Sequence, residues 1–306
     1  IKVAMYVFMA GTIFVAVCGN CMVIISISHF KQLHSPSNFL ILSLGCVDCL
    51  LGSLIMPYSM IRSVESCWYF GEIFCAIHSS LDMMMSIASI LHLGFIAADR
   101  YFAICDPLRY RNKMTMFNIT LFIVISWLFS FAFGFGVVLS KVNLAGIEEF
   151  VVSSSCVGAC IVILNKEWGM TPFLTFYLTC SIMIALYMKI FIIAKRHAHV
   201  IKTKFKDISN SKLSKRSERK AAKTLGTVVA VFLLCWMPYY IGSIVDPYVN
   251  FDTPAVVYDS FIWLAYFNST FNPFIYAFFF PWFRKALKII ATCKIFRPNS
   301  SRIQIY

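Results

Sequence analysis

Asp82 is an acidic residue set inside an apolar segment that is long enough to cross a membrane. Its sequence neighbours are Leu81 and the run Met83, Met84 and Met85. A charged side chain at the centre of a bilayer costs roughly 2.5–3.5 kcal/mol on insertion scales, so such residues usually face a cavity and have a partner. We therefore predict that Asp82 binds a cation that comes from outside. The alternative is a carboxylate that hydrogen-bonds its neighbours and serves packing alone.

Asp82 and Arg100 fall near the two ends of the same predicted helix. They are separated by 18 positions, which corresponds to about 27 Å along a helix axis. Asp82 would then face the outer part of the bilayer, and Arg100 would lie at the cytoplasmic rim. A ligand-binding acid and a switch arginine on one rigid helix form the geometry that a transmembrane signal needs.

The composition of the chain is that of an integral membrane protein. Of its 306 residues, 59% are hydrophobic and 13% are charged, and the mean hydropathy is +0.76. Soluble domains of this length do not have such a composition. We predict one domain over residues 1–306, an all-α bundle of seven transmembrane helices of about 20 residues or more. The predicted spans lie near residues 3–28, 38–61, 75–104, 116–139, 168–195, 221–243 and 255–280.

The distribution of charge predicts the orientation of the chain. Of the 27 Lys and Arg residues, only Lys2, Arg62, Lys141 and Lys166 fall on the side of the loops that follow the second, fourth and sixth spans. Cytoplasmic loops carry an excess of basic residues, so we expect the N-terminus outside and the C-terminus in the cytoplasm. The net charge of +13 is then explained by membrane topology and a cytoplasmic docking face, and no nucleic-acid partner is expected.

A short amphipathic segment follows the seventh span. Within residues 282–291, Phe283, Leu287 and Ile290 fall on one helical face and basic residues on the other. Such a pattern is typical of a helix that lies on a membrane surface. We predict an eighth, cytoplasmic helix in contact with lipid. The chain begins at Ile1 without Met, and we expect the native N-terminus to be missing.

Several short motifs follow one another in the order of the spans. They are Gly19-Asn20, Leu44 to Asp48, Asp99-Arg100-Tyr101, Trp127, Cys235-Trp236-Met237-Pro238 and Asn272-Pro273-x-x-Tyr276. Together they resemble the rhodopsin-like G-protein-coupled receptors over essentially the whole chain. The stretch from Asn268 to Phe283 closely resembles the trace amine-associated receptors of the aminergic branch, and we expect a subtype-4-like member.

The resemblance implies a function and a ligand site. The function is that of a plasma-membrane receptor, expected in olfactory sensory neurons, for a volatile or trace amine. It activates a heterotrimeric G protein of the Gs or olfactory type, raises cAMP and is no enzyme. Asp82 would pair with a protonated, primary amine. Tyr266 would donate its hydroxyl to the carboxylate of Asp82. The implied ligand-binding residues are Asp82, Tyr266, Trp236, Tyr239, Tyr240, Thr171, Thr175 and Trp263. For any one of the aromatic residues, ordinary core packing is the alternative.

The resemblance also implies a switch and a disulfide. The residues of the switch and of G-protein coupling are Asp99, Arg100, Tyr101, Tyr187, Glu218, Asn272, Pro273 and Tyr276. Glu218 would form an ion pair with Arg100 in the inactive receptor, and its alternative is a solvated charge. The disulfide would join Cys75 to Cys160, although Cys156 offers a second partner in the same loop.

Asp48 is a second acid within a span, and no cofactor other than an allosteric sodium ion is expected there. The candidate sodium site resembles that of the family and comprises Asp48, Asn20, Ser89, Asn268, Ser269 and Asn272. The alternative is a water-filled hydrogen-bond network. One departure from the family lies in the fifth span, where Thr179 replaces the usual proline and Pro172 lies further outward.

Two other functions compete with this reading. A classical monoamine receptor is the nearest alternative, and serines facing the pocket from the fifth span would favour it. An amine transporter belongs to a different class, and it predicts internal repeats or charged residues along a continuous path. The sequence has no internal repeat, and Asp48 and Asp82 are its mid-span acids.

Overall fold

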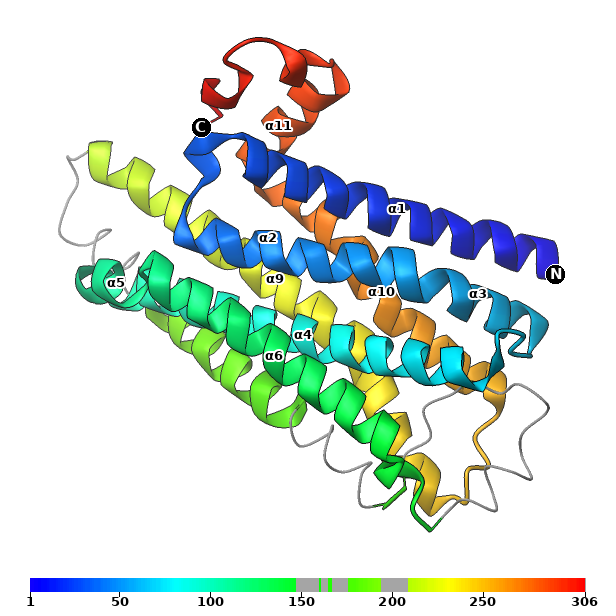
Figure 1. Ribbon diagram of the computed structural model, residues 1–306. Helices are drawn as coiled ribbons and strands as arrows, with labels where there is room; N and C mark the ends of the chain where they lie inside the picture. The colour runs from blue at the N-terminus through cyan, green and yellow to red at the C-terminus, as the bar shows by residue number, and fades with distance from the viewer. Residues whose placement is uncertain (147–159, 161–164, 167–175, 194–208, 306) are drawn as a thin grey trace.

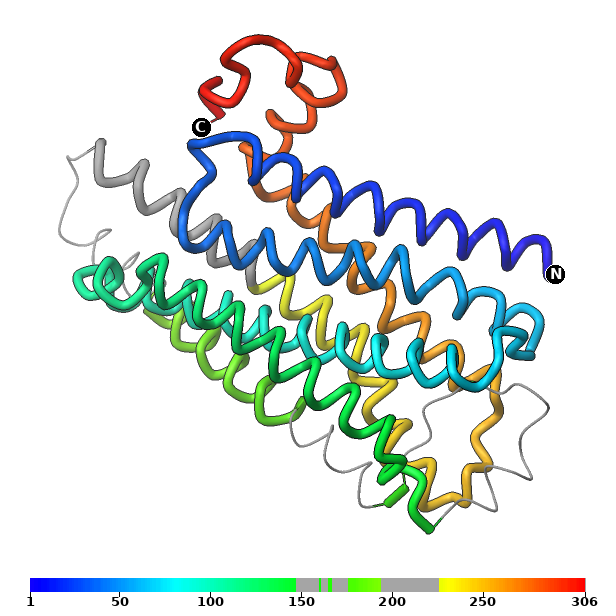
Figure 2. The backbone as a smooth tube through the Cα atoms, viewed as in Figure 1, coloured from blue at the N-terminus to red at the C-terminus, as the bar shows by residue number. Residues whose placement is uncertain are grey.

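The chain is an elongated bundle of long helices that lie side by side (Figure 1). The N-terminus lies at one end of the bundle, and the segment after α11 folds over the opposite end (Figure 2). We call these the α1 end and the α11 end. The computed structural model describes the following residues: 1–146, 160, 165–166, 176–193 and 209–305, the last range as backbone alone up to residue 225.

Seven long helical segments build the bundle. They are α1 (Lys2–His29), α2 (Pro36–Leu50) continued by α3 (Met56–Glu65), α4 (Gly71–Cys105), α6 (Met116–Ser140), the helix Phe176–Ile193, α9 (Ser209–Val245) and α10 (Ala255–Phe279). By length and composition, six of them are apolar enough to cross a bilayer. The seventh, α10, buries a polar face with Asn268, Ser269 and Asn272, which lowers its hydropathy. The fold is a seven-transmembrane-helix bundle.

Short elements connect and cap the long helices. The α-helical ones are α5 (Pro107–Lys113) and α11 (Pro281–Ala291). The 3-10 turns are Lys31–Leu33, Val142–Leu144, Asp246–Tyr248, Lys294–Phe296 and Ser300–Arg302. Helix α11 buries Trp282, Phe283, Ala286 and Ile289, while its basic residues stay outside, as expected of an amphipathic eighth helix.

The second crossing contains a π-helical turn at Leu51–Ile55, between α2 and α3. Pro57 follows this turn, and a proline has no N–H to bond the carbonyl one turn earlier, at Ser53. The helix accommodates the missing bond by widening locally. The sequence predicted one regular helix over 38–61. Helix α3 continues from this turn and carries Arg62 to the site described below, with Ser59 hydrogen-bonded to His78 and Tyr266.

Helix α4 runs through the bundle and packs against α2, α6 and α9. The backbones of α4 and α6 come close together at Gly134. A Cβ atom at this position would lie 2.8 Å from the carbonyl oxygen of Ser80 and 2.9 Å from the nitrogen of Met84. Only glycine allows the two backbones to approach so closely. Ser80 and Met84 flank Asp82, so this contact helps to fix the position of the acid.

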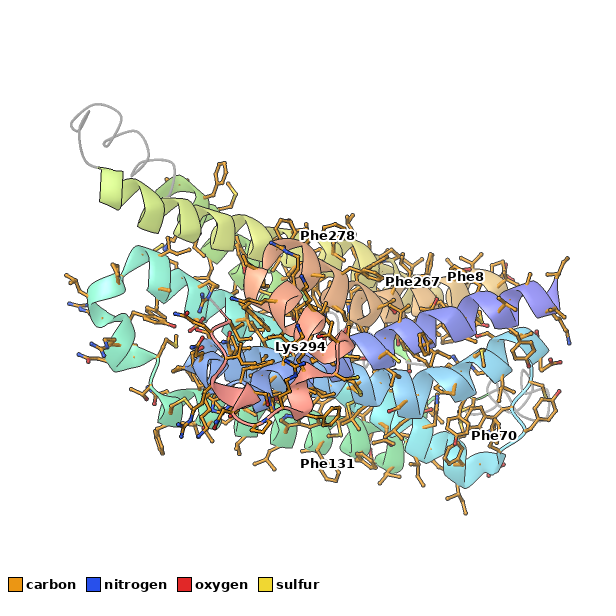
Figure 3. The ribbon with its side chains drawn as sticks, turned by 90° about the horizontal axis from the view of Figure 1, so that it is seen from above. Phe8, Phe70, Phe131, Phe267, Phe278 and Lys294 are labelled. Atoms are coloured by element: carbon orange, nitrogen blue, oxygen red, sulfur yellow. A yellow bond between two sulfur atoms is a disulfide. The ribbon has the colours of Figure 1, made fainter. Side chains whose placement is uncertain are left out.

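The sides of the bundle are apolar. Phe8, Phe131 and Phe278 have 62%, 52% and 77% of their surface exposed and point away from the helices (Figure 3). Large exposed apolar surfaces on a soluble protein would cause aggregation, whereas here they match the lipid that surrounds a membrane protein.

Candidate functional site

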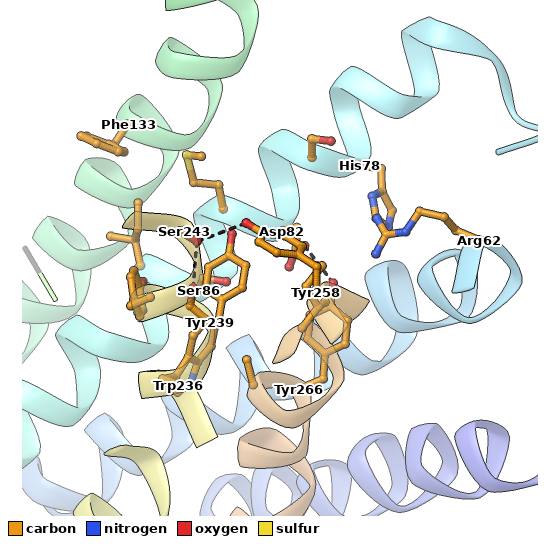
Figure 4. A pocket seen from close by; sticks show the side chains of 16 residues that line it. Arg62, His78, Asp82, Ser86, Phe133, Trp236, Tyr239, Ser243, Tyr258 and Tyr266 are labelled. Carbon is orange, nitrogen blue, oxygen red and sulfur yellow. Dashed lines mark hydrogen bonds between the residues drawn. The ribbon is translucent and has the colours of Figure 1, made fainter. Parts of the chain in front are cut away.

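A narrow pocket lies toward the α1 end of the bundle, between α4, α9 and α10 (Figure 4). Asp82 of α4 lines it, together with Tyr266 of α10. The hydroxyl of Tyr266 donates to Oδ2 of Asp82 at 2.8 Å, and only 1% of the Tyr266 surface is exposed. No Lys, Arg or His nitrogen of the described side chains lies within 4.0 Å of this carboxylate. Asp82 is therefore a hydrogen-bonded acid without an internal counter-ion in that part of the chain.

One wall of the pocket is aromatic and comes from α9. Trp236, Tyr239 and Tyr240 follow one another along this wall, and their ring centroids are 5.5–6.2 Å apart. Tyr240 also stacks on Phe176 at 4.1 Å. The negative faces of such rings attract a cation within about 6 Å. Together with a carboxylate, this wall suits an organic cation.

Polar residues line the pocket toward the α1 end. Arg62 of α3 donates from Nη1 to the carbonyl oxygen of Cys160 at 2.7 Å. Its Nη2 faces Oδ1 of Asp259 at 3.8 Å, which is an ion pair beyond hydrogen-bond distance. A disulfide joins Cys160 to Cys75 near the start of α4, the pairing that the resemblance implied. The disulfide thus ties the carbonyl that accepts from Arg62 to the start of α4.

Not every predicted ligand residue lines this pocket. Trp263 packs behind Tyr266, with ring centroids 5.6 Å apart, and donates from Nε1 to Oγ of Ser63 at 3.1 Å. Thr171 and Thr175 lie outside the residues that the structure describes. The pocket residues from the prediction are therefore Asp82, Trp236, Tyr239, Tyr240 and Tyr266.

Other pocket residues were missed by the sequence analysis. They are Arg62, His78, Ser243 and Tyr258, among others. His78 had a local signal, because it precedes Asp82 by one helical turn on the same face. Arg62 and Tyr258 come from other helices, and only the fold brings them here.

Asp48 is fully buried between α2 and α10. Its Oδ1 accepts a hydrogen bond from Ser269 and its Oδ2 one from Asn272, both at 2.7 Å. Asn20 of α1 donates to the carbonyl oxygen of Ser269 at 3.0 Å. Four other oxygens of the candidate sodium site are buried and have no hydrogen-bond partner among the described residues. They are Asn20 Oδ1, Ser89 Oγ, Asn268 Oδ1 and Asn272 Oδ1. Oxygen ligands of this kind suit a hard cation or water.

Arg100 lies toward the α11 end and is held by three elements. Its Nε donates to Oδ2 of Asp99 at 2.7 Å, and its Nη2 contacts the same oxygen and Oγ of Ser37 in α2. Tyr110 of α5 donates to Oδ1 of Asp99 at 3.0 Å and lies 2.9 Å from Oγ of Ser37. Burial and the Asp99 carboxylate raise the pKa of Tyr110, so its hydroxyl keeps the proton that it donates.

The remaining switch residues are spread along the α11 half. Pro273 fits against Gly19, where a Cβ would lie only 2.7 Å from the proline ring. Tyr276 is buried and packs on Phe283 of α11, with ring centroids 6.4 Å apart. Tyr187 is half-buried and Tyr101 packs on Phe102. The backbone of Glu218 belongs to α9, and its side chain lies outside the description.

The described residues contain no group of three or more His, Cys, Asp or Glu side chains that could hold a metal ion.

The family model for the 7 transmembrane receptor (rhodopsin family) matches residues 19–276.

Several proteins are similar to the chain over nearly its full length. Trace amine-associated receptor 4 of Rattus norvegicus is 49% identical, over 99% of this chain and 89% of that protein. Trace amine-associated receptor 2 of Homo sapiens is 51% identical, over 97% and 84%, respectively. Trace amine-associated receptor 13c of Danio rerio is 48% identical, over 100% and 90%. These similar identities do not single out one subtype.

Proposed function

The chain belongs to the rhodopsin family of seven-transmembrane receptors, among the trace amine-associated receptors, and we propose that it is activated by a small protonated amine bound at Asp82. The family consists of receptors and not of enzymes. The observation that carries the proposal is the buried contact of Asp82 with Tyr266, in a pocket where no described basic side chain pairs with the carboxylate. An ammonium group would supply the missing counter-charge and up to three hydrogen-bond donors.

The dimensions of the pocket favour a small ligand. The cavity volume is about 60 Å³, counted as the space that the centre of a water molecule can reach. On this measure, one water molecule requires roughly 10–15 Å³. The ammonium would lie at Asp82, beside the rings of Trp236, Tyr239 and Tyr240. These rings add cation–π attraction and exclude water, which strengthens the charge pairing.

Signal transmission would begin on α4, because this helix carries both Asp82 and Arg100. Asp99, Ser37 and Tyr110 restrain Arg100, and their contacts would stabilise the inactive state. Agonist would favour a state in which Arg100 is released and the α11 end accepts an apolar helix of a G protein. Glu218 would add to the restraint, and Tyr187 and Tyr276 would rearrange with α9 and α10. We propose coupling to Gs or the olfactory G protein, with a rise in cAMP.

Asp48 would bind sodium in the inactive state. A carboxylate, two neighbouring donors to it and unpaired amide and hydroxyl oxygens fit a hard cation. Asp48 would supply the charge, while Ser89 and Asn268 would supply neutral oxygens. The ion would neutralise the buried acid and so favour the packing that holds it.

The proposed location is the plasma membrane of olfactory sensory neurons, with the α1 end outside. The excess of basic residues at the α11 end supports this orientation. Helix α11 would rest on the inner leaflet, with Lys285 and Lys288 toward the lipid headgroups.

The test is a screen of primary, secondary and tertiary amines on cells that express the full-length chain, with cAMP as the readout. We expect responses to small amines that are strongest for primary ones. Untransfected cells provide the control for endogenous receptors. Silence of the whole panel at confirmed surface expression would contradict the proposed function, whereas a fall in cAMP would contradict only the stimulatory coupling.

A further inference from the structure

The pocket has a second polar end, which the amine at Asp82 does not use. Arg62 and His78 lie there side by side, away from the aromatic wall (Figure 4). They are 7% and 2% exposed. Among the described residues, neither Nε nor Nη2 of Arg62 has a hydrogen-bond partner, and Nδ1 of His78 has none. Buried polar groups without partners are uncommon in proteins and require an explanation.

The hydrogen bonds of His78 determine which of its ring nitrogens is an acceptor. Nε2 lies 3.2 Å from the carbonyl oxygen of Ile55, which can only accept, so Nε2 carries the proton. Nδ1 of the neutral ring is then an acceptor. Both unpaired nitrogens of Arg62 are donors, since a guanidinium cannot accept. The second end of the pocket therefore offers donors and an acceptor next to each other.

A hydroxyl group satisfies both kinds of group at once. Its oxygen accepts from Arg62, and its proton is donated to Nδ1 of His78. A methyl group would leave both residues unpaired. A second ammonium has no lone pair for Arg62 and would bring a positive charge against the guanidinium. The charge of Arg62 is already balanced by Asp259 at 3.8 Å, so a neutral group fits better than a carboxylate.

The two ends of the pocket belong to one hydrogen-bond network. His78 Nε2 lies 3.3 Å from Oγ of Ser59, and this oxygen lies 3.2 Å from the hydroxyl of Tyr266, which donates to Asp82. His78 and Asp82 are one turn apart on α4, or about 6 Å along its axis. A chain of four or five carbons, which separates nitrogen from oxygen by about 6–7.5 Å when extended, is close to this separation.

We propose that the ligand is an amino alcohol, whose ammonium binds Asp82 and whose hydroxyl bridges Arg62 and His78. This proposal rests on the proposed function and specifies the class of amine. It makes Arg62 and His78 determinants of ligand specificity. The disulfide-linked Cys160 takes part indirectly, because its carbonyl holds Nη1 of Arg62 at 2.7 Å and orients the guanidinium.

Three probes of equal size separate the possibilities: 5-aminopentan-1-ol, n-hexylamine and 1,5-diaminopentane. Their EC50 values are measured for cAMP in cells that express the full-length receptor. Hydrogen bonds to a charged group favour the alcohol over the alkylamine by about tenfold. The diamine should be the weakest. Equal EC50 values for the alcohol and the alkylamine would overturn the proposal and leave amine recognition at Asp82 intact. Silence of all three would instead count against the proposed function.

Variants of the receptor then test which residues cause the preference for 5-aminopentan-1-ol over n-hexylamine. In Arg62→Gln the ratio of the two EC50 values should fall to about one, because the charged donors are lost. A purely structural defect would weaken both ligands alike and leave the ratio unchanged. His78→Phe keeps an aromatic ring without the acceptor and should also reduce the ratio. Ser243→Ala, on the side of Asp82 away from Arg62 (Figure 4), should preserve it. Loss of the preference in Ser243→Ala alone would place the hydroxyl against α9 and refute the assignment.

Discussion

Gly134 allows α6 to approach α4 beside the ligand pocket, and replacing it with alanine should disturb both stability and amine recognition. The added Cβ would lie 2.8 Å from the Ser80 carbonyl oxygen, whereas ordinary contacts begin at 3.4 Å. The neighbouring atoms belong to the backbone of Ser80 and Met84 and cannot rotate away. Helices α4 and α6 must therefore separate by about 0.6 Å, the difference between these distances.

The size of the effect follows from two opposing terms. Overpacking of a well-packed contact costs about 1–3 kcal/mol. Replacing glycine by alanine in a helix contributes about 0.4–1 kcal/mol of stability through the unfolded state. We expect a net loss of about 1 kcal/mol for Gly134→Ala. Ser80 and Met84 flank Asp82, so the shift should also raise the EC50 for amines by about tenfold, as small misplacements of a charged group do.

Gly136→Ala is the matched control. It lies on the same helix, and a Cβ there would meet nothing within 4 Å. This variant should melt at or above the temperature of the wild type in a thermal-shift assay of detergent-solubilised receptor, and its EC50 should be unchanged. Gly134→Ala should melt at a lower temperature. Equal melting of the two variants would refute the inferred close contact between α4 and α6.

Three further predictions concern the rest of the bundle. Tyr110→Phe removes a donor to Asp99 and should raise basal cAMP a few-fold at matched surface expression, because one partly exposed hydrogen bond contributes about 0.5–1.5 kcal/mol; unchanged basal signalling, as expected for the control Tyr69→Phe at an exposed loop residue, would contradict the restraint on Arg100. Asp48→Asn should abolish the sodium dependence of amine potency, which we expect to be about fivefold in the wild type when sodium replaces choline; an equal dependence in the variant would place the ion elsewhere. Peptide mapping without reduction should recover Cys75 bonded to Cys160, and recovery of Cys75 with Cys156 would contradict the contact of the Cys160 carbonyl with Arg62.

The seven-helix fold could be predicted because each membrane span is a continuous apolar run of sufficient length in the sequence. The details that depend on backbone hydrogen bonding were harder to see. Pro57 could have indicated a disturbed second helix, but its π-turn at Leu51–Ile55 depends on how the missing bond is accommodated. The seventh helix, α10, is not among the helices apolar enough to count as spans, because its buried face carries Asn268, Ser269 and Asn272.

The candidate site was predictable only in part, for a related reason. Asp82 stands out in the sequence because an acid in an apolar run is costly, and the aromatic residues of α9 follow from the family motif. Arg62 and Tyr258 carry no such local signal, since their place in the pocket depends on the packing of α3 and α10 around α4. Trp263 shows the converse, because the family resemblance suggested that it lines the pocket, whereas its side chain lies behind Tyr266.

The central claim is that the charge of Asp82 binds the ligand. Its most direct test is the binding of a radiolabelled primary amine to membranes that contain the wild type, Asp82→Asn or Asp252→Asn. Asparagine keeps the shape of the side chain and removes its charge, and losing one partner of a buried ion pair costs about 3–5 kcal/mol. We predict that Asp82→Asn weakens binding at least about a hundredfold, while Asp252→Asn, an exposed loop residue with the same change in charge, binds like the wild type. Equal affinity of Asp82→Asn and the wild type would contradict the account.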